Sequence, residues 1–398
     1  MIEKPIDELC FSDLGRLIEN RVRECKTVEY KRELPGMKDS DKKEFLGDIA
    51  SFANASGGYI FFGIDEERDD KGKPTGLPKD AVGVGKTNLD GEMRRLENLI
   101  RDGIAPRIWG VRLRAVESED RAVLAAWIPQ SLRPLHMVTI GGSQKFYSRN
   151  SAGKYRLDVE EIRSGFLRAH DLTERVRRFR DERLGRIIAG EGPLPTQQGP
   201  AVVLHVVPLA AFIESRDFSV GEIDAQRRLL PDGAFVSSRA NLEGLLEGAR
   251  HSHRYASRYV QYFRTGAIEF FQALNQDFFV DSTGNTLRSA VFEASVREEL
   301  SKSFQFVKGL QLNAPLVVMM SLFGVKGLKL GVGPRQGLGR DLVPLDRDHL
   351  LLPETHVETF GRDIDAILKP VFDIVWNAFG FERCQNYDAS GKWRPPQL

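Results

Sequence analysis

The chain has 398 residues, of which 41% are hydrophobic and 28% charged, and its formal net charge is +1 at pH 7. These values are typical of a soluble globular protein, and the length exceeds what one compact core usually holds, so we expect two domains. A net charge this close to zero neither favours nor excludes a nucleic-acid partner, because that depends on local clusters of charge.

The cysteines and the apolar runs exclude several classes of protein. Cys10, Cys25 and Cys384 do not have the spacing of a zinc finger, and their odd number without a secretory signal favours a reducing compartment. The most apolar run, Ala314–Val325, is too short to cross a bilayer. We therefore expect a cytoplasmic protein that does not enter a membrane.

Residues 1–170 alternate between helical and extended patterns, which predicts an α+β domain. The expected helices are 11–24, 40–56, 89–104 and a helix that opens at 158 and continues through 186. The expected strands are 27–33, 59–65, 107–116, 121–129 and 144–150, with a polar loop at 66–78.

A linker rich in Gly, Pro and Gln at 189–201 predicts a boundary, so that 171–200 would be an arginine-rich helix and linker and 201–398 a second α+β domain. That domain is expected to sense a trigger, drive oligomerisation or act as a second lobe. Its expected elements are a strand at 202–209, a hairpin at 257–274 turning at 264–266, a helix at 286–307, a strand pair within 314–330 and a terminal helix at 363–381 broken near Pro370.

Three acidic residues of the first domain are candidate metal ligands. If the strands 27–33 and 59–65 are neighbours, Glu29 and Asp65 lie close together on one face. Glu24 joins them only if the chain bends between Cys25 and Thr27. Converging carboxylates repel one another unless a divalent cation neutralises them, and oxygen ligands suit Mg²⁺ or Mn²⁺.

The neighbouring acidic residues Glu33 and Glu66 are interpreted as solvated. Lys31 shares the strand face of Glu29 and could steady a phosphate in its transition state.

The segments VEYKREL, KEFLGDIASFANASGGYIFFGIDE and PLH…KFYSRNSAGKY resemble the Schlafen-type AlbA domain over about residues 10–170. The resemblance implies a Schlafen/AlbA-like mixed sheet with packed helices. In Schlafen ribonucleases three carboxylates form the active site, and the resemblance places them at Glu24, Glu29 and Asp65. It thereby implies a metal-dependent endonuclease, with Lys31 in support, that cleaves structured, tRNA-like RNA as an effector of bacterial defence or stress.

Two other functions stay open. The same face could bind nucleic acid without cleaving it, as in a transcriptional regulator. A nucleotide-binding protein is the third possibility, because Gly83–Thr87 reads GVGKT, although the first glycine that a P-loop needs is replaced by Asp80.

Candidate nucleic-acid contacts lie in two segments besides Lys31. Lys145, Tyr147 and Arg149 mix basic and aromatic side chains, and Tyr147 and Arg149 should share one strand face. Arg177 and Arg178 belong to a stretch of six arginines at 175–186, which is either a grip on RNA or a solvated helix with intrahelical pairs. Because only one AlbA-type lobe is evident, we also expect a homodimer or a larger homo-oligomer.

Overall fold

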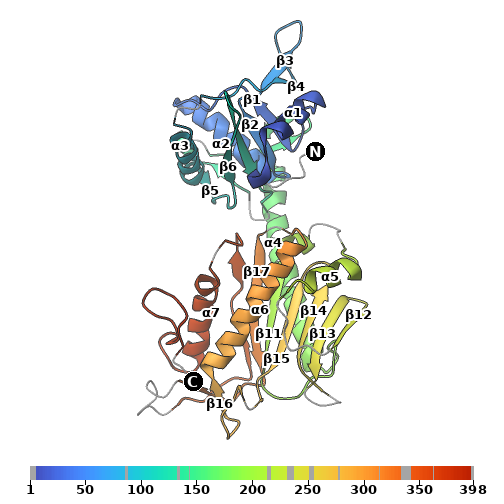
Figure 1. Cartoon of the computed structure of the whole chain (residues 1–398). Coiled ribbons are helices and arrows are strands. Elements are labelled where there is room, and N and C mark those ends of the chain that lie inside the picture. The colour runs from blue at the N-terminus through green and yellow to red at the C-terminus, as the bar shows by residue number, and fades with distance from the viewer. Residues whose placement is uncertain are drawn as a thin grey trace. The chain divides into compact units, whose positions relative to one another are not determined.

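The computed structural model describes residues 6–85, 88–131, 135–142, 144–212, 217–230, 237–250, 255–276, 278–312, 314–332, 342–361 and 363–395. The chain divides into two compact units, residues 1–171 and 172–398, each with its own core (Figure 1). Both units combine helices with sheets, so the α+β class is confirmed. Within the part of the chain that the structure describes, no helix is both long and apolar enough to span a membrane.

The first unit is built on a mixed sheet of order β1-β2-β7-β6. Its strands are β1 (Val28–Lys31), β2 (Gly58–Phe62), β7 (Ala122–Ile128) and β6 (Arg112–Glu117). A second sheet has the order β10-β9-β8-β5, with β10 (Gly153–Arg156), β9 (Lys145–Asn150), β8 (Met137–Val138) and β5 (Ile104–Ala105). Strands β1 and β2 are parallel neighbours with Glu29 opposite Ile60, so the condition that the sequence analysis set for its carboxylate site is met.

Helices cover both faces of β2, which explains why its sequence is almost entirely apolar. The helices of this unit are α1 (Phe11–Glu19), α2 (Asp39–Asn54) and α3 (Leu89–Gly103), with short 3₁₀ turns η1 (Ile6–Glu8) and η2 (Ile140–Gly142). Ile60 and Phe62 pack with Phe52 of α2, whereas Phe61 packs with Leu17 of α1. The unit is therefore layered, and β1 lies at an edge of its sheet.

The segment that follows β2 differs from the prediction of one long strand and a loop. The strand ends at Phe62, and Gly63 then adopts a φ of 100°, which favours glycine and turns the chain. Asp65 does not close β2 but opens a hairpin of β3 (Asp65–Arg68) and β4 (Pro74–Asp80). The side chain of Asp69 accepts hydrogen bonds from the backbone of Lys71 and Lys73 and so closes the hairpin turn.

The second unit contains an antiparallel sheet of order β12-β13-β14-β15-β11-β17-β19, with β20 also paired to β17. The strands are β11 (Ala201–Pro208), β12 (Ser237–Asn241), β13 (Gly244–Arg250), β14 (Ala256–Phe263), β15 (Ile268–Ala273), β17 (Leu316–Phe323), β19 (His349–Leu351) and β20 (Thr355–Val357). The helices are α4 (Val159–Ile188), α5 (Val220–Arg227), α6 (Ser289–Gly309) and α7 (Ile364–Ala378), with a 3₁₀ turn η3 (Leu209–Phe212).

Each face of this sheet is covered by different helices. Val202, Leu204 and Val206 of β11 belong to the core that contains α6 and α7. The alternate residue Val203 lies in the core on the other face with Leu184, from the C-terminal half of α4. The continuous helix predicted from residue 158 to 186 is thus confirmed, and its second half belongs to the second unit.

Two predictions for this unit are wrong in detail. Helix α7 runs unbroken through Pro370, because residues on both sides of the proline, such as Leu368 and Phe372, stay buried in the same core. That burial offsets the roughly 3 kcal/mol cost of an internal proline. The expected strand pair within 314–330 does not form, because β18 (Lys329–Gly331) pairs in parallel with β16 (Thr286–Arg288) instead of with β17. The hairpin of β14 and β15 is confirmed.

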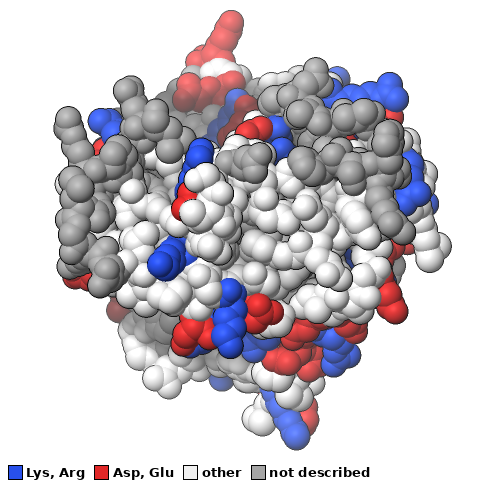
Figure 2. Space-filling model, turned by 90° about the horizontal axis from the view of Figure 1, so that it is seen from below, with Lys and Arg blue, Asp and Glu red and all other residues white. Residues whose placement is uncertain are grey.

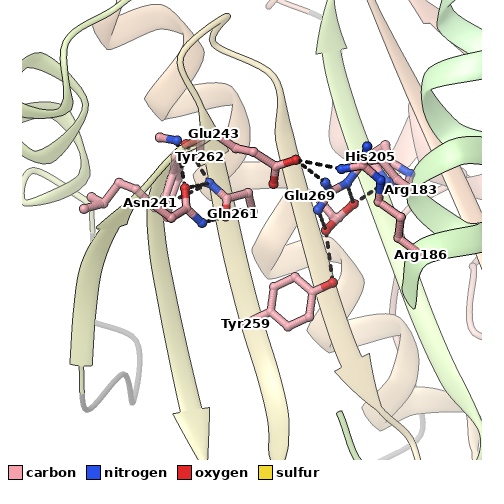
Figure 3. Close-up of polar contacts among 11 residues, drawn as sticks. Arg183, Arg186, His205, Asn241, Glu243, Tyr259, Gln261, Tyr262 and Glu269 are labelled. Carbon is pink, nitrogen blue, oxygen red and sulfur yellow. Dashed lines mark hydrogen bonds and ion pairs between the residues drawn. The ribbon is translucent and has the colours of Figure 1, made fainter. Parts of the chain in front are cut away.

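A buried ion-pair cluster fastens α4 to this sheet (Figure 3). Glu269 of β15 is fully buried, and both its oxygens bind the guanidinium of Arg183, at 2.7 and 2.8 Å. His205 Nε2 lies 3.0 Å from the same carboxylate, and the Tyr259 hydroxyl donates to it at 3.0 Å. Burial alone would raise the pKa of Glu269, but the bonds from Arg183 and His205 lower it to about 2.

Replacement of Glu269 should therefore cost far more stability than replacement of its exposed neighbour. In Glu269→Gln the buried Arg183 loses its main counter-charge, and the free energy of unfolding should fall by about 3–5 kcal/mol. Because the folded-state pKa is depressed, this contribution is present above the ordinary pKa near 4.5 and is lost as the pH falls toward 2. Urea unfolding of both proteins from pH 7 downward measures the difference.

The matched control is Glu243→Gln, because Glu243 also pairs with Arg183, at 2.6 Å, but is 29% exposed. Its loss should cost no more than about 1 kcal/mol. Equal effects of the two substitutions would show that Glu269 does not anchor the helix.

Candidate carboxylate site

A tight bend before β1 brings Glu24 back toward the strand. The backbone N–H of Cys25 donates to the carbonyl of Val28 at 3.0 Å, which folds residues 25–28 into a turn. Glu24 Oε1 then accepts the backbone N–H of Tyr30 at 2.8 Å, and the Tyr30 hydroxyl donates to Val22 at 2.8 Å. The bend that Glu24 requires is therefore present.

Glu66 meets Glu24 at the neighbouring hairpin. The backbone N–H of Gly76 in β4 donates to Glu66 Oε2 at 3.1 Å, and its carbonyl accepts the N–H of Glu24 at 2.7 Å. Gly76 has a φ of 74°, a conformation that favours glycine. Glu24 and Glu66 are thus joined through the backbone of one glycine.

The environment raises the proton affinity of both carboxyl groups. Burial, with contributions from Glu66 and Glu29, raises the pKa of Glu24 to about 7. Burial, with a contribution from Glu29, also raises the pKa of Glu66. Glu24, Glu29 and Glu66 therefore act on one another electrostatically, and they form the carboxylate site of the first unit.

Asp65 lies apart from this group. Its carboxylate forms an ion pair with Arg32, which is 57% exposed. The pairing of β3 with β4 is irregular between Asp65 and Glu66, and it is Glu66 that shares Gly76 with Glu24. Glu66, which the sequence indicated as solvated, is therefore the acidic residue of β3 whose contacts lead to Glu24.

Glu29 is held by two cations. It is 8% exposed, and its two oxygens lie 2.6 Å from Lys31 Nζ and 2.8 Å from Arg149 Nη1. Burial alone would raise the pKa of Glu29, but these cations bring it below its ordinary value. Arg149 also stacks on Phe52, 3.6 Å from the ring centre, and reaches the carbonyl of Cys25 at 3.4 Å. The ion pair therefore ties β1, β9 and α2 together.

Two buried residues that sequence reasoning missed extend this network into α2. Asp48 lies 3.6 Å from Lys31 Nζ and 2.7 Å from Lys154 Nζ, and Lys154 also pairs with Glu44 at 2.8 Å. Asp48 and Glu29 in turn raise the pKa of Lys31, although burial acts in the opposite direction. A polar position on the buried side of a helix was the available signal, since Asp48 stands between Leu46 and Ile49.

The expected nucleic-acid contacts on β9 face inward. Tyr147 and Arg149 do share one strand face, but that face is turned to α2: Tyr147 lies beside Gly47, and Arg149 is 4% exposed. Lys154, opposite Arg149 in the register, lies over the Tyr147 ring at 5.6 Å. Lys145 at the start of the strand is partly exposed.

The arginine-rich half of α4 is largely engaged by acidic residues. Arg177 pairs with Glu354 at 2.9 Å and with Glu174 at 3.0 Å. Arg183 lies in the buried cluster of Figure 3, and Arg178 is exposed. The face drawn in Figure 2 is mostly uncharged, and its Lys and Arg side chains alternate with Asp and Glu.

The GVGKT segment gives no nucleotide site that can be described. Val84 forms a short bridge with Ala122, and the backbone N–H of Gly83 donates to the carbonyl of Gly63, while Lys86 and Thr87 lie outside the described residues.

The donor set at Glu24 and Glu66 fits a small divalent cation. Among the described residues no three His, Cys, Asp or Glu side chains are arranged to hold one metal ion, and both oxygens of Glu29 lie against cations. Neither Glu24 nor Glu66 has an ion-pair partner among these residues. Since Mg²⁺ commonly takes only one or two protein carboxylates, with water and substrate phosphate as its other ligands, this pair is sufficient.

Residues 24–158 match the family model described as Schlafen, AlbA_2. The resemblance predicted from the sequence is thereby confirmed, and this part of the chain is a Schlafen AlbA_2 domain. The match points to a function connected with nucleic acid.

Two solved structures are also similar to parts of the chain. One is the N-terminal domain of a putative ATP-dependent DNA helicase RecG-related protein from Nitrosomonas europaea, at 23% identity and a TM-score of 0.23, over 29% of this chain and 71% of that chain. The other is the DIP2311 protein from Corynebacterium diphtheriae, at 14% identity and a TM-score of 0.25, over 37% of this chain and 29% of that chain. No curated protein matches the chain.

The raised pKa of Glu24 predicts a pH-dependent loss of stability. Because the pKa rises from 4.5 to about 7 on folding, the cost of ionising Glu24 is absent below pH 4.5, grows between pH 4.5 and 7, and is fully present above pH 7. Glu24→Gln, which keeps an acceptor for Tyr30, should therefore match the wild type at pH 4. At pH 8 it should be more stable by about 1–2 kcal/mol, allowing for solvent screening. Urea unfolding without divalent cations measures this.

Glu33→Gln is the control, because Glu33 is an exposed glutamate of the same segment. Its stability difference from the wild type should stay within about 0.5 kcal/mol at both pH values. If the stability of Glu24→Gln also stays within about 0.5 kcal/mol of the wild type at both pH values, the charge of Glu24 carries no cost in the folded state.

Proposed function

We propose that the first unit is a metal-dependent endonuclease that cleaves structured, tRNA-like RNA. The observation that carries the proposal is the convergence of Glu24 and Glu66, two carboxyl groups with raised pKa values, beside Glu29 in a Schlafen AlbA_2 domain. Carboxyl groups that share a site without a cation are costly, and such costs are concentrated at functional sites.

Each residue of the site has a role in this proposal. Glu24 and Glu66 would hold Mg²⁺ or Mn²⁺, which when bound supplies charge stabilisation and an activated water for phosphodiester hydrolysis. Lys31 is 34% exposed and is held between Glu29 and Asp48, so it presents a fixed ammonium group beside the carboxylates. Glu29 and Asp48 thus position Lys31 to meet a phosphate.

A second candidate function is binding of nucleic acid without cleavage, as in a transcriptional regulator. The ion pairs of Glu29 with Lys31 and Arg149 favour it, because they neutralise the carboxylate that a three-ligand metal site would need.

Cleavage assays with matched variants separate the two functions. Total tRNA and single-stranded DNA are incubated with Mn²⁺ or EDTA and with wild type, Glu24→Gln, Glu66→Gln or Asp65→Asn. We expect metal-dependent cleavage of tRNA that falls by about 100-fold or more in the two Glu variants, because each removes a metal ligand. Asp65→Asn should stay within a few fold of the wild type, since Asp65 pairs with Arg32.

Loss of cleavage in Asp65→Asn but not in Glu66→Gln would show that Asp65, and not Glu66, acts with Glu24. Binding of tRNA without cleavage by any of the four proteins would support the regulator.

Metal binding can also be measured without any activity. At pH 8, saturating Mn²⁺ should raise the thermal unfolding midpoint of the wild type, because a ligand that binds only the folded state stabilises it by mass action. Glu24→Gln and Glu66→Gln should lose most of this shift, whereas Glu67→Gln should keep it, because Glu67 pairs with Arg21. An undiminished shift in both site variants would place the metal elsewhere.

A further inference from the structure

The strand pair β9–β10 has an outer face that carries no part of the carboxylate site. Arg149, Tyr147 and Lys154 point to α2, and side chains alternate along each strand. Phe146 and Tyr155 therefore point the other way, and Tyr155 stands opposite Ser148 in the register. The two faces of one strand pair thus differ in chemistry.

Three aromatic side chains gather on this outer face. Phe146 of β9 meets Phe166 of α4 edge to face, with 6.1 Å between ring centres and 84° between ring planes. Phe166 is 44% exposed and Tyr155 is 36% exposed. We call Phe146, Tyr155 and Phe166 the aromatic face. Half-exposed aromatic rings on a sheet are the usual platform on which proteins stack unpaired bases.

Hydrogen bonds fix Tyr155 in this exposed position. Its hydroxyl donates to Glu161 Oε1 at 3.1 Å, and Glu161 also accepts the backbone N–H of Asp158 at 2.9 Å. Asp158 in turn accepts the N–H of Glu161 at 2.8 Å and so caps α4. Because its hydroxyl is held, the ring can offer its plane to a ligand at little cost in conformational entropy.

The charges beside the aromatic face suit an anionic ligand. Asp158 and Glu161 are engaged in the cap of α4, which leaves Glu160 as the remaining acidic side chain of that turn. Arg163 of α4, one helical turn before Phe166, is exposed and has no ion-pair partner among the described residues. Arg156 is also exposed, but it stands opposite Tyr147 in the register and so belongs to the other face of the strand pair. The unpaired guanidinium group of Arg163 can meet a backbone phosphate.

We infer that the aromatic face binds a single-stranded segment of nucleic acid, whose bases stack on Tyr155 and Phe166 and whose backbone phosphate meets Arg163. The inference rests on the proposed function in that the unit takes nucleic acid as its ligand. It does not depend on Glu24 and Glu66 being the catalytic groups.

Fluorescence anisotropy of labelled oligouridylate and oligothymidylate, with EDTA present to prevent cleavage, tests the inference on the full chain. Tyr155→Ala and Phe166→Ala should each weaken binding by about tenfold, because one stacked base is lost. Tyr155→Phe keeps the ring but loses the hydrogen bond that fixes it, so it should bind much better than Tyr155→Ala and within a few fold of the wild type. Trp109→Ala is the matched control, because Trp109 is another exposed aromatic residue of this unit, at 48%.

The salt dependence tests the phosphate contacts separately. Arg163→Gln should reduce the slope of log Kd against log salt by about one, whereas Tyr155→Ala should leave the slope unchanged. Equal affinities for the two oligonucleotides would indicate stacking alone, and a preference for oligouridylate would add a contact to the 2′-hydroxyl.

Unchanged affinity in both Tyr155→Ala and Phe166→Ala, with their folding verified by circular dichroism, would overturn the inference. So would a shift of the monomer–dimer equilibrium in sedimentation without a change in binding, because the aromatic face would then be a contact between copies of the chain. If Glu24→Gln and Glu66→Gln cleave as the wild type does while the aromatic variants bind weakly, then Glu24 and Glu66 are not the catalytic groups. The inference that the aromatic face binds nucleic acid would still be supported.

Discussion

The ion pair of Glu29 with Arg149 and Lys31 is the interaction on which the first unit depends. A carboxylate at 8% exposure on an edge strand is expensive to bury unless cations and hydrogen bonds compensate it. Arg149 supplies that compensation from another sheet and, through the carbonyl of Cys25, also holds the turn that carries Glu24. The position of Glu24 is therefore coupled to the packing of β9 against α2.

This arrangement separates two kinds of carboxylate within a short distance. Glu29 is the charged partner of Lys31 and Arg149, which hold its pKa below the ordinary value, and its role is to fix these cations in place. Glu24 and Glu66 are hydrogen-bonded to backbone N–H groups and raise one another's proton affinity. Titratable groups whose environments drive their pKa values apart indicate a division of roles at a site.

Much of this fold follows from sequence patterns. The 3.6-residue period of α2 and the continuous apolar run of β2 predicted a helix and a central strand, whereas the pairing of β2 with β1 was only assumed and its parallel direction comes from the structure. The bend at Cys25–Thr27 was a geometric requirement of Glu24, and the structure contains it. The family pattern over residues 24–158 was also visible in the sequence.

What the sequence could not show is the consequence of one misplaced strand end. The sequence pattern predicted a strand that ends at Asp65. In the structure β2 ends at Phe62, the chain turns at Gly63, and Asp65 is the first residue of β3. In the hairpin that results, Asp65 pairs with Arg32 and Glu66 accepts the N–H of Gly76 beside Glu24. The pairing of Arg149 with Glu29 is a contact across 120 positions of the chain, which no local pattern predicts.

The charge composition of a segment is also a poor guide to function, because the partners of its charged residues can lie far along the chain. The arginines at 175–186 looked like a grip on RNA, but Arg177 and Arg183 pair with Glu354 and Glu269, which lie far along the chain. A basic residue contributes to a nucleic-acid surface only if it is not already paired with a carboxylate. By that criterion Arg163, beside the aromatic face, is available to a nucleic acid, because it is exposed and has no ion-pair partner among the described residues. The density of arginine in the sequence therefore does not locate a nucleic-acid surface, because it does not show which arginines are already paired.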